Sequence, residues 1–363
     1  MKTVDHKCPS CNAPIKYNPK NKNWVCEYCG SKFTLDQLEA NEKNYESTNV
    51  NNSKELKKAK EQDKSVKSND AHEEEMDEYL CQDCGAKIVA DKNTSATFCV
   101  YCKNTAILKS RLSDKFTPSK IIPFEKTKED AIKAFISVGK GKFLMPKEFS
   151  DPKNIDELTG IYIPFWLYNC KMHGVYQGRG TRVTSWTTGD YIYTKTDTYN
   201  VEREGDYNYE NIPMDGSLRF NDAIMNSIEP FNYDNLVDFN YSYLAGFLAE
   251  KYDVEKDEAK KVNSQRAEVT TYTDLESKAR TGYSTLVPKS KTNNIIDESL
   301  EYALLPVWMV NIKYNDKMYT FAMNGETGKM IGDIPYSKTK LLIFILILFA
   351  VLFGITAVIT YFV

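Results

Sequence analysis

Eight of the nine cysteines in the chain fall in a spacing that occurs twice, and this repeat restricts the fold more than any other feature of the sequence. The first copy reads Cys8-x2-Cys11-x14-Cys26-x2-Cys29, and the second reads Cys81-x2-Cys84-x14-Cys99-x2-Cys102. In each copy two tight turns supply two thiolates apiece, which together make the tetrahedral four-sulfur site typical of structural zinc. The sequence therefore predicts two zinc ribbons, each binding one structural Zn²⁺ ion.

We place the first ribbon at residues 1–35 and the second at residues 79–114, each with a β-hairpin between its cysteine pairs. A unit of this size cannot bury a sufficient core, so metal binding supplies much of the energy that folds it. A catalytic zinc keeps an open position beside three protein ligands, whereas these sites offer four. A redox dithiol would need a thioredoxin-like βαβ setting, which the sequence does not show. His6 is expected to be exposed and not to bind the metal.

The cysteines should meet a reducing compartment. The chain opens MKTVDHKCPSCNAP, without the basic and apolar segments of a secretory signal. In the cytosol, paired Cys-x2-Cys units favour metal binding over disulfides. Cys170 stands apart from the repeat and is expected to be a small buried thiol. His173 follows three positions later, on the opposite face of a strand, so the two should not form a nucleophile and its base.

The segment 36–78 between the ribbons is rich in Glu, Lys, Asn, Ser and Asp. It has too few large apolar side chains to bury a core. We predict a charged flexible linker that gives the first ribbon independent reach, with a helix formed on binding a partner as the alternative.

The last 23 residues, 341–363, contain no charged side chain. As a helix this stretch would extend about 34 Å, which is enough to cross the hydrocarbon core of a bilayer. Lys338 and Lys340 precede it and place that side in the cytoplasm by the positive-inside tendency. We therefore predict a tail-anchored, single-pass protein of the cell membrane, with the bulk of the chain on the cytoplasmic side.

Residues 115–337 hold the main core and are predicted to form an α+β domain. Helices are expected at Lys128–Val138, Arg219–Ile228, Asn235–Lys251 and Glu255–Arg280, and strands within Gly160–Asn211, Glu301–Val310 and Lys317–Met323. Gly178, Gly180, Gly189 and Gly205 are expected at turns or bulges. The sheet should be mainly antiparallel and covered on one side.

Signs of catalysis are few, and we predict that the chain is not an enzyme and has no catalytic residue. There are three histidines, and neither a Gly-x-Ser-x-Gly elbow nor a His-Glu-x-x-His helix occurs. The segment Gly325–Lys329 resembles a phosphate loop only superficially and is interpreted as a β-turn. An enzyme in residues 115–337 stays a minor alternative. Both ribbons are mildly basic, which would suit phosphate contact, but the net charge of −3 and the lack of an arginine-rich helix leave the signal for nucleic-acid binding weak.

Several stretches resemble one group of proteins. They are Tyr162-Ile-Pro-Phe-Trp166, Gly178-Arg-Gly-Thr-Arg-Val183, Asn211-Ile-Pro-Met-Asp-Gly-Ser217, Ser227-Ile-Glu-Pro-Phe231 and Leu305-Pro-Val-Trp308. Together with the paired ribbons and the terminal anchor, they are similar to membrane-anchored double zinc-ribbon proteins of Gram-positive bacteria. Ribbons of that group resemble the ribbon of transcription factor B, and its members are sometimes labelled primosomal helicase. The motifs that a helicase motor needs are absent here, so only the ribbon is shared.

This resemblance implies zinc on the eight repeated cysteines and a scaffold for envelope-stress maintenance. The implied partners are flotillin-like or phage-shock-type membrane proteins. We therefore predict a tail-anchored adaptor that docks protein partners at the membrane, where confinement raises their effective concentration. The alternative is a membrane-tethered nucleic-acid-binding protein of transcription or replication.

Overall fold

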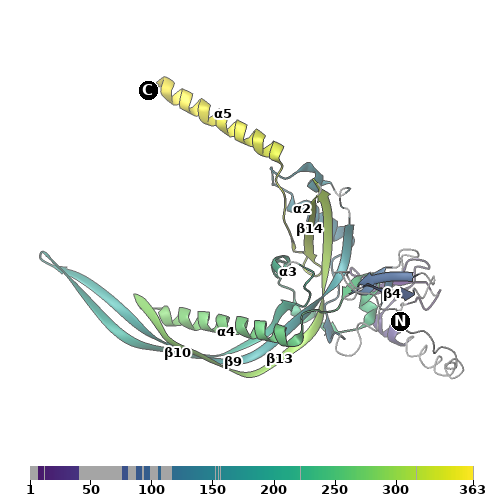
Figure 1. The fold of residues 1–363 in the computed structure, drawn as a ribbon, viewed down its shortest axis with the longest axis horizontal. Coiled ribbons are helices and arrows are strands. Elements are labelled where there is room, and N and C mark those ends of the chain that lie inside the picture. The colour runs from purple at the N-terminus through teal and green to yellow at the C-terminus, as the bar shows by residue number, and fades with distance from the viewer. Residues whose placement is uncertain are drawn as a thin grey trace, which may run out of the picture.

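The computed structural model shows a mixed α+β protein with several sheets, few helices and one apolar helix at its C-terminal end (Figure 1). The α+β class predicted from the sequence is confirmed at this level. The structure describes residues 7–11, 13–40, 76–80, 87–91, 94–98, 105–107, 117–151, 153, 155, 157–220, 222–315 and 317–362.

The first cysteine repeat encloses a three-stranded antiparallel sheet in the order β1-β2-β3. Its strands are β1 (Ile15–Asn18), β2 (Asn23–Cys26) and β3 (Lys32–Phe33). Side chains alternate along β2, so Trp24 and Cys26 point inward while their neighbours are half-exposed. A helical stretch at residues 35–40 follows, with Leu38 buried. The predicted hairpin is present, and the ordered unit continues past its predicted end at residue 35.

The four ligand positions of the second repeat, Cys81, Cys84, Cys99 and Cys102, lie outside the described residues, as does most of the predicted linker 36–78. Strands near them are described. β4 (Met76–Leu80) pairs with β5 (Lys87–Asp91), and β6 (Thr94–Phe98) pairs with β7 (Thr105–Ile107). β6 also pairs with β12 (Leu248–Glu250) of the large sheet. Part of the segment predicted as a second ribbon is thereby joined to the α+β domain.

The large sheet has ten strands in the order β11-β8-β13-β9-β12-β6-β7, with β10 added to β9, β14 to β13 and β15 to β14. Its other members are β8 (Lys120–Ile121), β9 (Glu157–Thr188), β10 (Tyr191–Asp215), β11 (Val237–Asp238), β13 (Thr285–Tyr314), β14 (Lys317–Asn324) and β15 (Met330–Gly332). β12 runs parallel to β9, and β8 runs parallel to β13. The other pairings described are antiparallel, as predicted.

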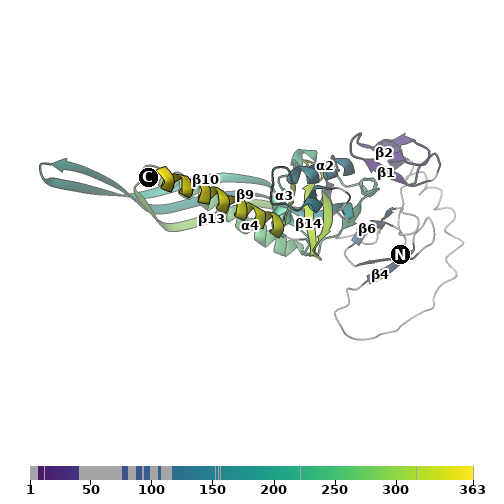
Figure 2. The same cartoon turned by 90° about the horizontal axis from the view of Figure 1, so that it is seen from above.

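Three of these strands continue far beyond the body of the protein as a long curved blade (Figures 1 and 2). β9 lies between β10 and β13 and pairs antiparallel with both. The pairing with β13 ends at Thr181 opposite Thr285, and β9 and β10 continue alone to their turn. From Tyr168 to this turn the blade extends about 20 residues, or roughly 66 Å at about 3.3 Å per residue. We call residues 182–194 the hairpin tip.

Three of the four glycines expected at turns or bulges lie within the blade strands. Gly189, at φ +62°, forms the turn between β9 and β10. Gly178, Gly180 and Gly205 lie inside paired strands, and a bulge of β13 between Pro288 and Ser290 lies opposite Gly178 and Gln177. At Gly180 an added Cβ would lie only 2.6 Å from the ring of Tyr283. These glycines therefore permit close packing inside long strands and do not divide them into short ones.

Two long helices agree with their predicted positions. α2 (Lys128–Val138) begins with a capping box in which the side chains and backbone N–H groups of Thr127 and Asp130 bond reciprocally, and Gly139 ends it. α4 (Lys256–Arg280) covers one face of the blade. Its buried stripe repeats every fourth residue and consists of Ala259, Asn263, Ala267, Thr271, Leu275 and Ala279.

The helix predicted over Asn235–Lys251 is wrong. The chain there forms two 3-10 turns, η5 (Tyr233–Asn235) and η6 (Tyr241–Leu244), together with β11 and β12. The Asn240 side chain accepts a hydrogen bond from the Ser242 N–H and caps a single turn. The next carbonyl after η6, that of Ala245, accepts a hydrogen bond from the Tyr17 N–H of the first ribbon. Tertiary contacts therefore replace the helical pattern in this segment.

The body of the sheet is covered on both faces, whereas coverage of one face was predicted. α3 (Asp222–Ile228) packs against one face, where Met225 meets a cluster that includes Phe165. On the other face Tyr162 packs with Phe247 and with the first ribbon. A short 3-10 helix, η3 (Lys147–Ser150), follows α2. The prediction of one covered face holds for the blade alone.

The chain ends in α5 (Lys338–Phe362), which leaves the end of the body that carries α2 and β14 (Figure 1). The part Lys338–Ile359 is long and apolar enough to cross a membrane, and its most apolar window has no residue buried within the protein. The predicted apolar helix is thus present.

Candidate metal centre

The four cysteines of the first repeat converge on one point. The sulfur atoms of Cys8, Cys11, Cys26 and Cys29 all lie within 4.8 Å of one another. The Sγ atoms of Cys8 and Cys29 are 3.5 Å apart, as are those of Cys11 and Cys26. A tetrahedral ion with zinc–sulfur bonds of about 2.3 Å separates its sulfurs by roughly 3.8 Å. The donor set and its spacing therefore fit one four-coordinate metal ion.

Short hydrogen-bonded turns hold these sulfurs in place. In the second cysteine pair the Gly30 N–H donates to the Cys26 carbonyl at 2.9 Å, and the Cys26 N–H donates to the Ser31 carbonyl at 2.9 Å. Gly30 has φ +74°, a left-handed conformation that disfavours a side chain, which explains a glycine directly after the last ligand. Cys8 and Cys26 are buried, and the other two ligands are exposed. The site therefore lies at the ribbon surface with all four protein ligands in place.

Hydrogen bonding and desolvation move the pKa values of the outer two thiols in opposite directions. The pKa of Cys29 is lowered to about 6, first by the Ser31 hydroxyl and then by the Ser31 backbone N–H. The backbone at Ala13 favours the thiolate of Cys11, but desolvation and the neighbouring sulfurs raise the pKa of that thiol to about 12. Four thiols in one space do not ionise together without a cation, so a bound metal would be required to hold four thiolates here.

The ribbon is docked on the α+β domain and does not have the independent reach predicted for it. Trp24, only 2% exposed, donates from Nε1 to the Ser242 carbonyl at 2.7 Å. Its ring lies 5.0 Å from the Tyr17 ring and 5.3 Å from the Tyr243 ring. The Tyr17 N–H adds a backbone hydrogen bond of 3.0 Å to Ala245. Because Trp24 and Tyr17 are buried and Tyr243 is half-buried in the contact, the ribbon and the domain form one unit.

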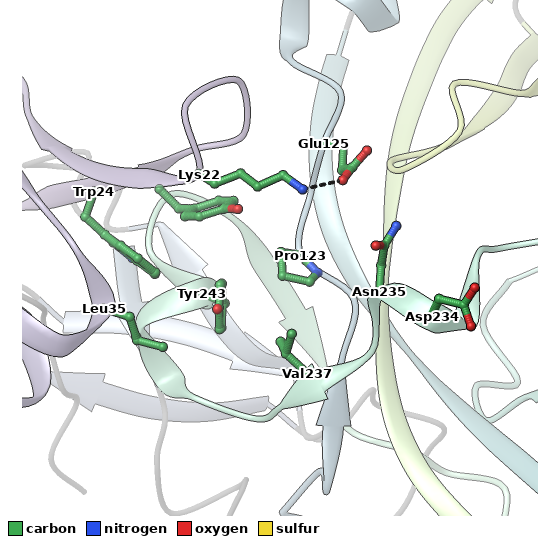
Figure 3. A pocket seen from close by; sticks show the side chains of 10 residues that line it. Lys22, Trp24, Leu35, Pro123, Glu125, Asp234, Asn235, Val237 and Tyr243 are labelled. Atoms are coloured by element: carbon green, nitrogen blue, oxygen red, sulfur yellow. Dashed lines mark hydrogen bonds and ion pairs between the residues drawn. The ribbon is translucent and has the colours of Figure 1, made fainter.

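A pocket of about 290 Å³ lies at the edge of this contact (Figure 3). Lys22 extends from the ribbon toward the domain, and its Nζ lies 2.7 Å from Oε1 of Glu125. The Asn235 amide donates to the Glu326 carboxylate. The rest of the lining is largely apolar or aromatic, from Tyr17, Trp24, Leu35, Pro123, Val237 and Tyr243, with Asp234 as a further polar side chain. The pocket therefore offers mainly apolar surface, since Lys22 and Asn235 already bind carboxylates of the domain.

The structure also describes the other residues singled out from the sequence. Cys170 and His173 lie on opposite faces of β9, as predicted. Cys170 is buried, and desolvation raises the pKa of its thiol, while His173 Nδ1 lies 2.7 Å from a carboxylate oxygen of Asp206. Residues 325–329 form a tight turn between β14 and β15, where the Asn324 side chain accepts two backbone hydrogen bonds. The β-turn interpretation is confirmed.

Sequence reasoning missed the docking contact and the exposed character of the hairpin tip. A signal for the first was available, because Trp24 is a large apolar residue in a module too small to bury it. For the tip, the signal is that Asp190 is the one charged residue in the stretch from Val183 to Thr194. A charge-poor aromatic stretch at a hairpin turn indicates a surface that something else covers.

Comparison with known proteins places the chain in a family. No protein-family model matches it, and no solved structure matches it. The uncharacterized protein YdjG of Bacillus subtilis strain 168 is 32% identical over 341 residues, which cover 93% of this chain and 92% of YdjG. The chain belongs to the YdjG family. The likeness spans nearly all of both chains.

Proposed function

We propose that this member of the YdjG family is a zinc-ribbon adaptor, anchored in the membrane by α5, that docks protein partners on its blade. The observation that carries the proposal is the blade itself. It is an arm of roughly 66 Å, three-stranded as far as Thr181 and two-stranded beyond, and α4 packs on one face of its three-stranded part. Such an arm adds surface and reach without enlarging the core of the body. This geometry suits a protein that contacts other proteins at a distance from its own anchor.

The hairpin tip has the chemistry of a protein-docking surface. Trp186 and Tyr193 are each 48% exposed, lie opposite one another in the β9–β10 register, and stack with ring centroids 5.7 Å apart. Tyr191 and Ile192 are still more exposed. Aromatic side chains of this kind supply much of the binding energy in protein interfaces, where charged residues are depleted. The tip is therefore the proposed contact for a protein partner.

The base of the tip is held in a fixed position. The Arg182 guanidinium lies 5.2 Å from the ring centroids of both Tyr199 and Tyr283, and its Nε donates to the Gly282 carbonyl at 2.8 Å. This contact ties β9 and β10 to the loop that follows α4. A preorganised arm loses little conformational entropy when a partner binds, which favours affinity.

In this proposal the metal is zinc, and its role is structural. Cys8, Cys11, Cys26 and Cys29 would hold one ion with no open position, and the equivalent cysteines of the second repeat would hold another. Lys338 and Lys340 favour the cytoplasmic side for the bulk of the chain. Anchoring would confine the blade to a layer near the membrane and raise its effective concentration toward membrane partners. Flotillin-like or phage-shock-type membrane proteins are the first partners to seek, by the resemblance seen in the sequence.

The docking proposal is tested by affinity purification of the full-length chain from nuclease-treated native membranes. The tip variant carries Trp186→Ser and Tyr193→Ser, and the matched control carries Tyr28→Ser and Val269→Ser, two exposed hydrophobic residues outside the tip. We expect one set of membrane proteins to co-purify with the native chain and the control and to be lost with the tip variant. If the tip variant recovers the same membrane proteins in the same amounts as the native chain, docking at the tip is contradicted. Loss of every partner after nuclease favours the nucleic-acid alternative.

Anchoring is tested by alkaline carbonate extraction. The full-length chain should stay in the membrane pellet, because α5 spans the bilayer in this proposal. A chain that ends at Ser337 should be released into the supernatant. If the full-length chain is released as well, α5 does not span the membrane.

A further inference from the structure

A loop of the α+β domain, residues 139–147, lies against the start of α5. The Ser337 N–H donates to the Leu144 carbonyl at 2.8 Å, and Lys340 Nζ donates to the Met145 carbonyl at 2.7 Å. The ring of Phe143 lies 6.3 Å from the ring of Phe344, centroid to centroid. The loop therefore contacts the chain on both sides of the point where the apolar run of α5 begins.

The contact between the two phenylalanine rings fixes the level of this loop relative to a bilayer. Phe344 lies three residues after Leu341, which is about 4.5 Å along the helix axis at about 1.5 Å per residue. If α5 spans the bilayer, as proposed above, Phe344 lies just inside the apolar layer, and Phe143 reaches the same level. Phe143 is 61% exposed within the protein, so its ring is available to lipid.

The charged residues of the two segments in contact all have one sign. Residues 139–147 and 336–344 include neither aspartate nor glutamate, and their charged residues are Lys140, Lys142, Lys147, Lys338 and Lys340. Lys140, Lys142 and Lys338 are exposed. Tyr336 is also 61% exposed and lies two residues before the start of the helix. Basic residues beside aromatic rings at this level match a membrane surface, where anionic headgroups lie above the apolar layer.

The fold holds the loop with its basic side outward. Gly139 ends α2, donating its N–H to the Ile136 carbonyl, and a Cβ at this position would collide with Met145. Met145 is buried with Phe135 in the cluster beneath α2. Gly141 has φ +78°, which turns the chain between the two lysines of the loop. Burial of Met145 on the inner side leaves Lys140, Lys142 and Phe143 on the outer side.

We propose that residues 139–147, with Tyr336 and Lys338, form a membrane-contact collar that binds anionic lipid headgroups and inserts Phe143 at the interface. Lipid is the occupant because the collar is continuous with the helix that would enter the bilayer, and its charge is complementary to anionic headgroups. The collar would set the orientation of the body. It would hold the α2 end at the membrane, while the blade leaves the body at the opposite end (Figure 1).

The collar is tested by hydrogen exchange on the full-length chain in nanodiscs. One set contains phosphatidylcholine alone, and the other contains phosphatidylcholine with phosphatidylglycerol. We expect the peptide 139–147 to exchange about tenfold more slowly in the anionic nanodiscs, because each lysine near the surface contributes attraction to anionic lipid. The variant Lys140→Glu with Lys142→Glu should lose this dependence on lipid. The control Lys256→Glu with Lys261→Glu changes two exposed lysines of α4 and should keep it.

Exchange of α5 in the same experiment separates the two proposals. If the peptide 139–147 exchanges at the same rate in both lipids while α5 is protected in both, the collar is overturned and the anchoring stands. If α5 itself is unprotected, the anchoring is overturned and the collar with it. A lipid dependence that the Lys140→Glu, Lys142→Glu variant retains would also overturn the collar, because the effect would not come from its lysines.

Discussion

Replacing Trp24 with phenylalanine tests whether the first ribbon and the α+β domain form one unit. Trp24 is buried between the Tyr17 and Tyr243 rings, and its Nε1 donates to the Ser242 carbonyl at 2.7 Å. Phenylalanine keeps one aromatic ring in the site but removes the indole N–H and part of the ring volume. No cysteine changes, so the metal ligands are preserved.

The structure allows the cost of this substitution to be worked out. The Ser242 carbonyl keeps the hydrogen bond from the Ala245 N–H but loses the indole donor, and the net loss of one hydrogen bond costs about 1 kcal/mol. The missing part of the ring leaves a small cavity worth about 1 kcal/mol more. We therefore expect the free energy that holds the ribbon on the domain to fall by about 2 kcal/mol. Since about 1.4 kcal/mol is a tenfold change in an equilibrium constant, the ribbon should open roughly 30 times as often.

Hydrogen exchange of the full-length, metal-loaded chain measures this opening. Peptides that cover β1 and β2 and the facing segment 240–247 should both exchange faster in the Trp24→Phe variant. Tyr28→Phe is the matched control, because Tyr28 lies on the same ribbon and is 86% exposed. If the segment 240–247 exchanges at the native rate in the Trp24→Phe variant, the ribbon does not protect it and the reasoning is refuted.

Three further substitutions test separate features of the molecule. Cys26→Ser should remove about one zinc equivalent per chain by elemental analysis under reducing conditions, whereas Cys170→Ser should remove none. Gly174→Val should lower the melting temperature, at a cost of about 1–3 kcal/mol, because a Cβ there would lie 2.5 Å from Thr271 Cγ2 of α4; an unchanged value would argue against close packing of that helix. Burial raises the pKa of Glu229 to about 7 from an ordinary value of 4.5, so the folded state holds the proton of this carboxyl more tightly than the unfolded chain does. This contribution to folding stability is fully present below pH 4.5 and is lost as the pH rises through 7. Glu229→Gln should therefore raise the melting temperature at pH 8 and leave it unchanged at pH 4.5, and equal shifts at both pH values would contradict this.

The features that sequence predicted well are those whose signals lie close together in the chain. α2 agrees with its predicted bounds because Thr127, Asp130 and Gly139 mark its two ends locally. The first cysteine cluster follows from a spacing contained within 22 residues, from Cys8 to Cys29. The turn at residues 325–329 is likewise specified by its own Asn, Gly and Thr residues. In each case one short window holds all the interacting groups.

The blade and the docked ribbon arise from pairs that no short window contains. β9 and β13 pair over most of their length although Thr181 and Thr285 are about 100 residues apart. Trp24 and Ser242 are separated by 218 positions. The apolar residues near Tyr241–Leu244 suggested a helix because their partner, the ribbon, was not visible in the local sequence. The local pattern therefore predicted a helix in a segment where the Ala245 carbonyl instead bonds to the ribbon.

The metal centre supports the body of the protein, and the tip depends on other contacts. The ribbon covers η6, and the chain then continues to Phe247, which stacks on Phe124 at 4.1 Å, and into β12 beside β9. Loss of the ion should therefore loosen this part of the body first. The blade beyond Tyr168 is instead packed by the later part of α4, where Ala267, Leu275 and Ala279 lie in clusters whose buried residues include none from the ribbon. Ala259, at the start of α4, lies in the same cluster as Trp24. Because the packing of the blade beyond this point is separate from that of the ribbon, a structural metal can stabilise the base of the arm without controlling what its tip binds.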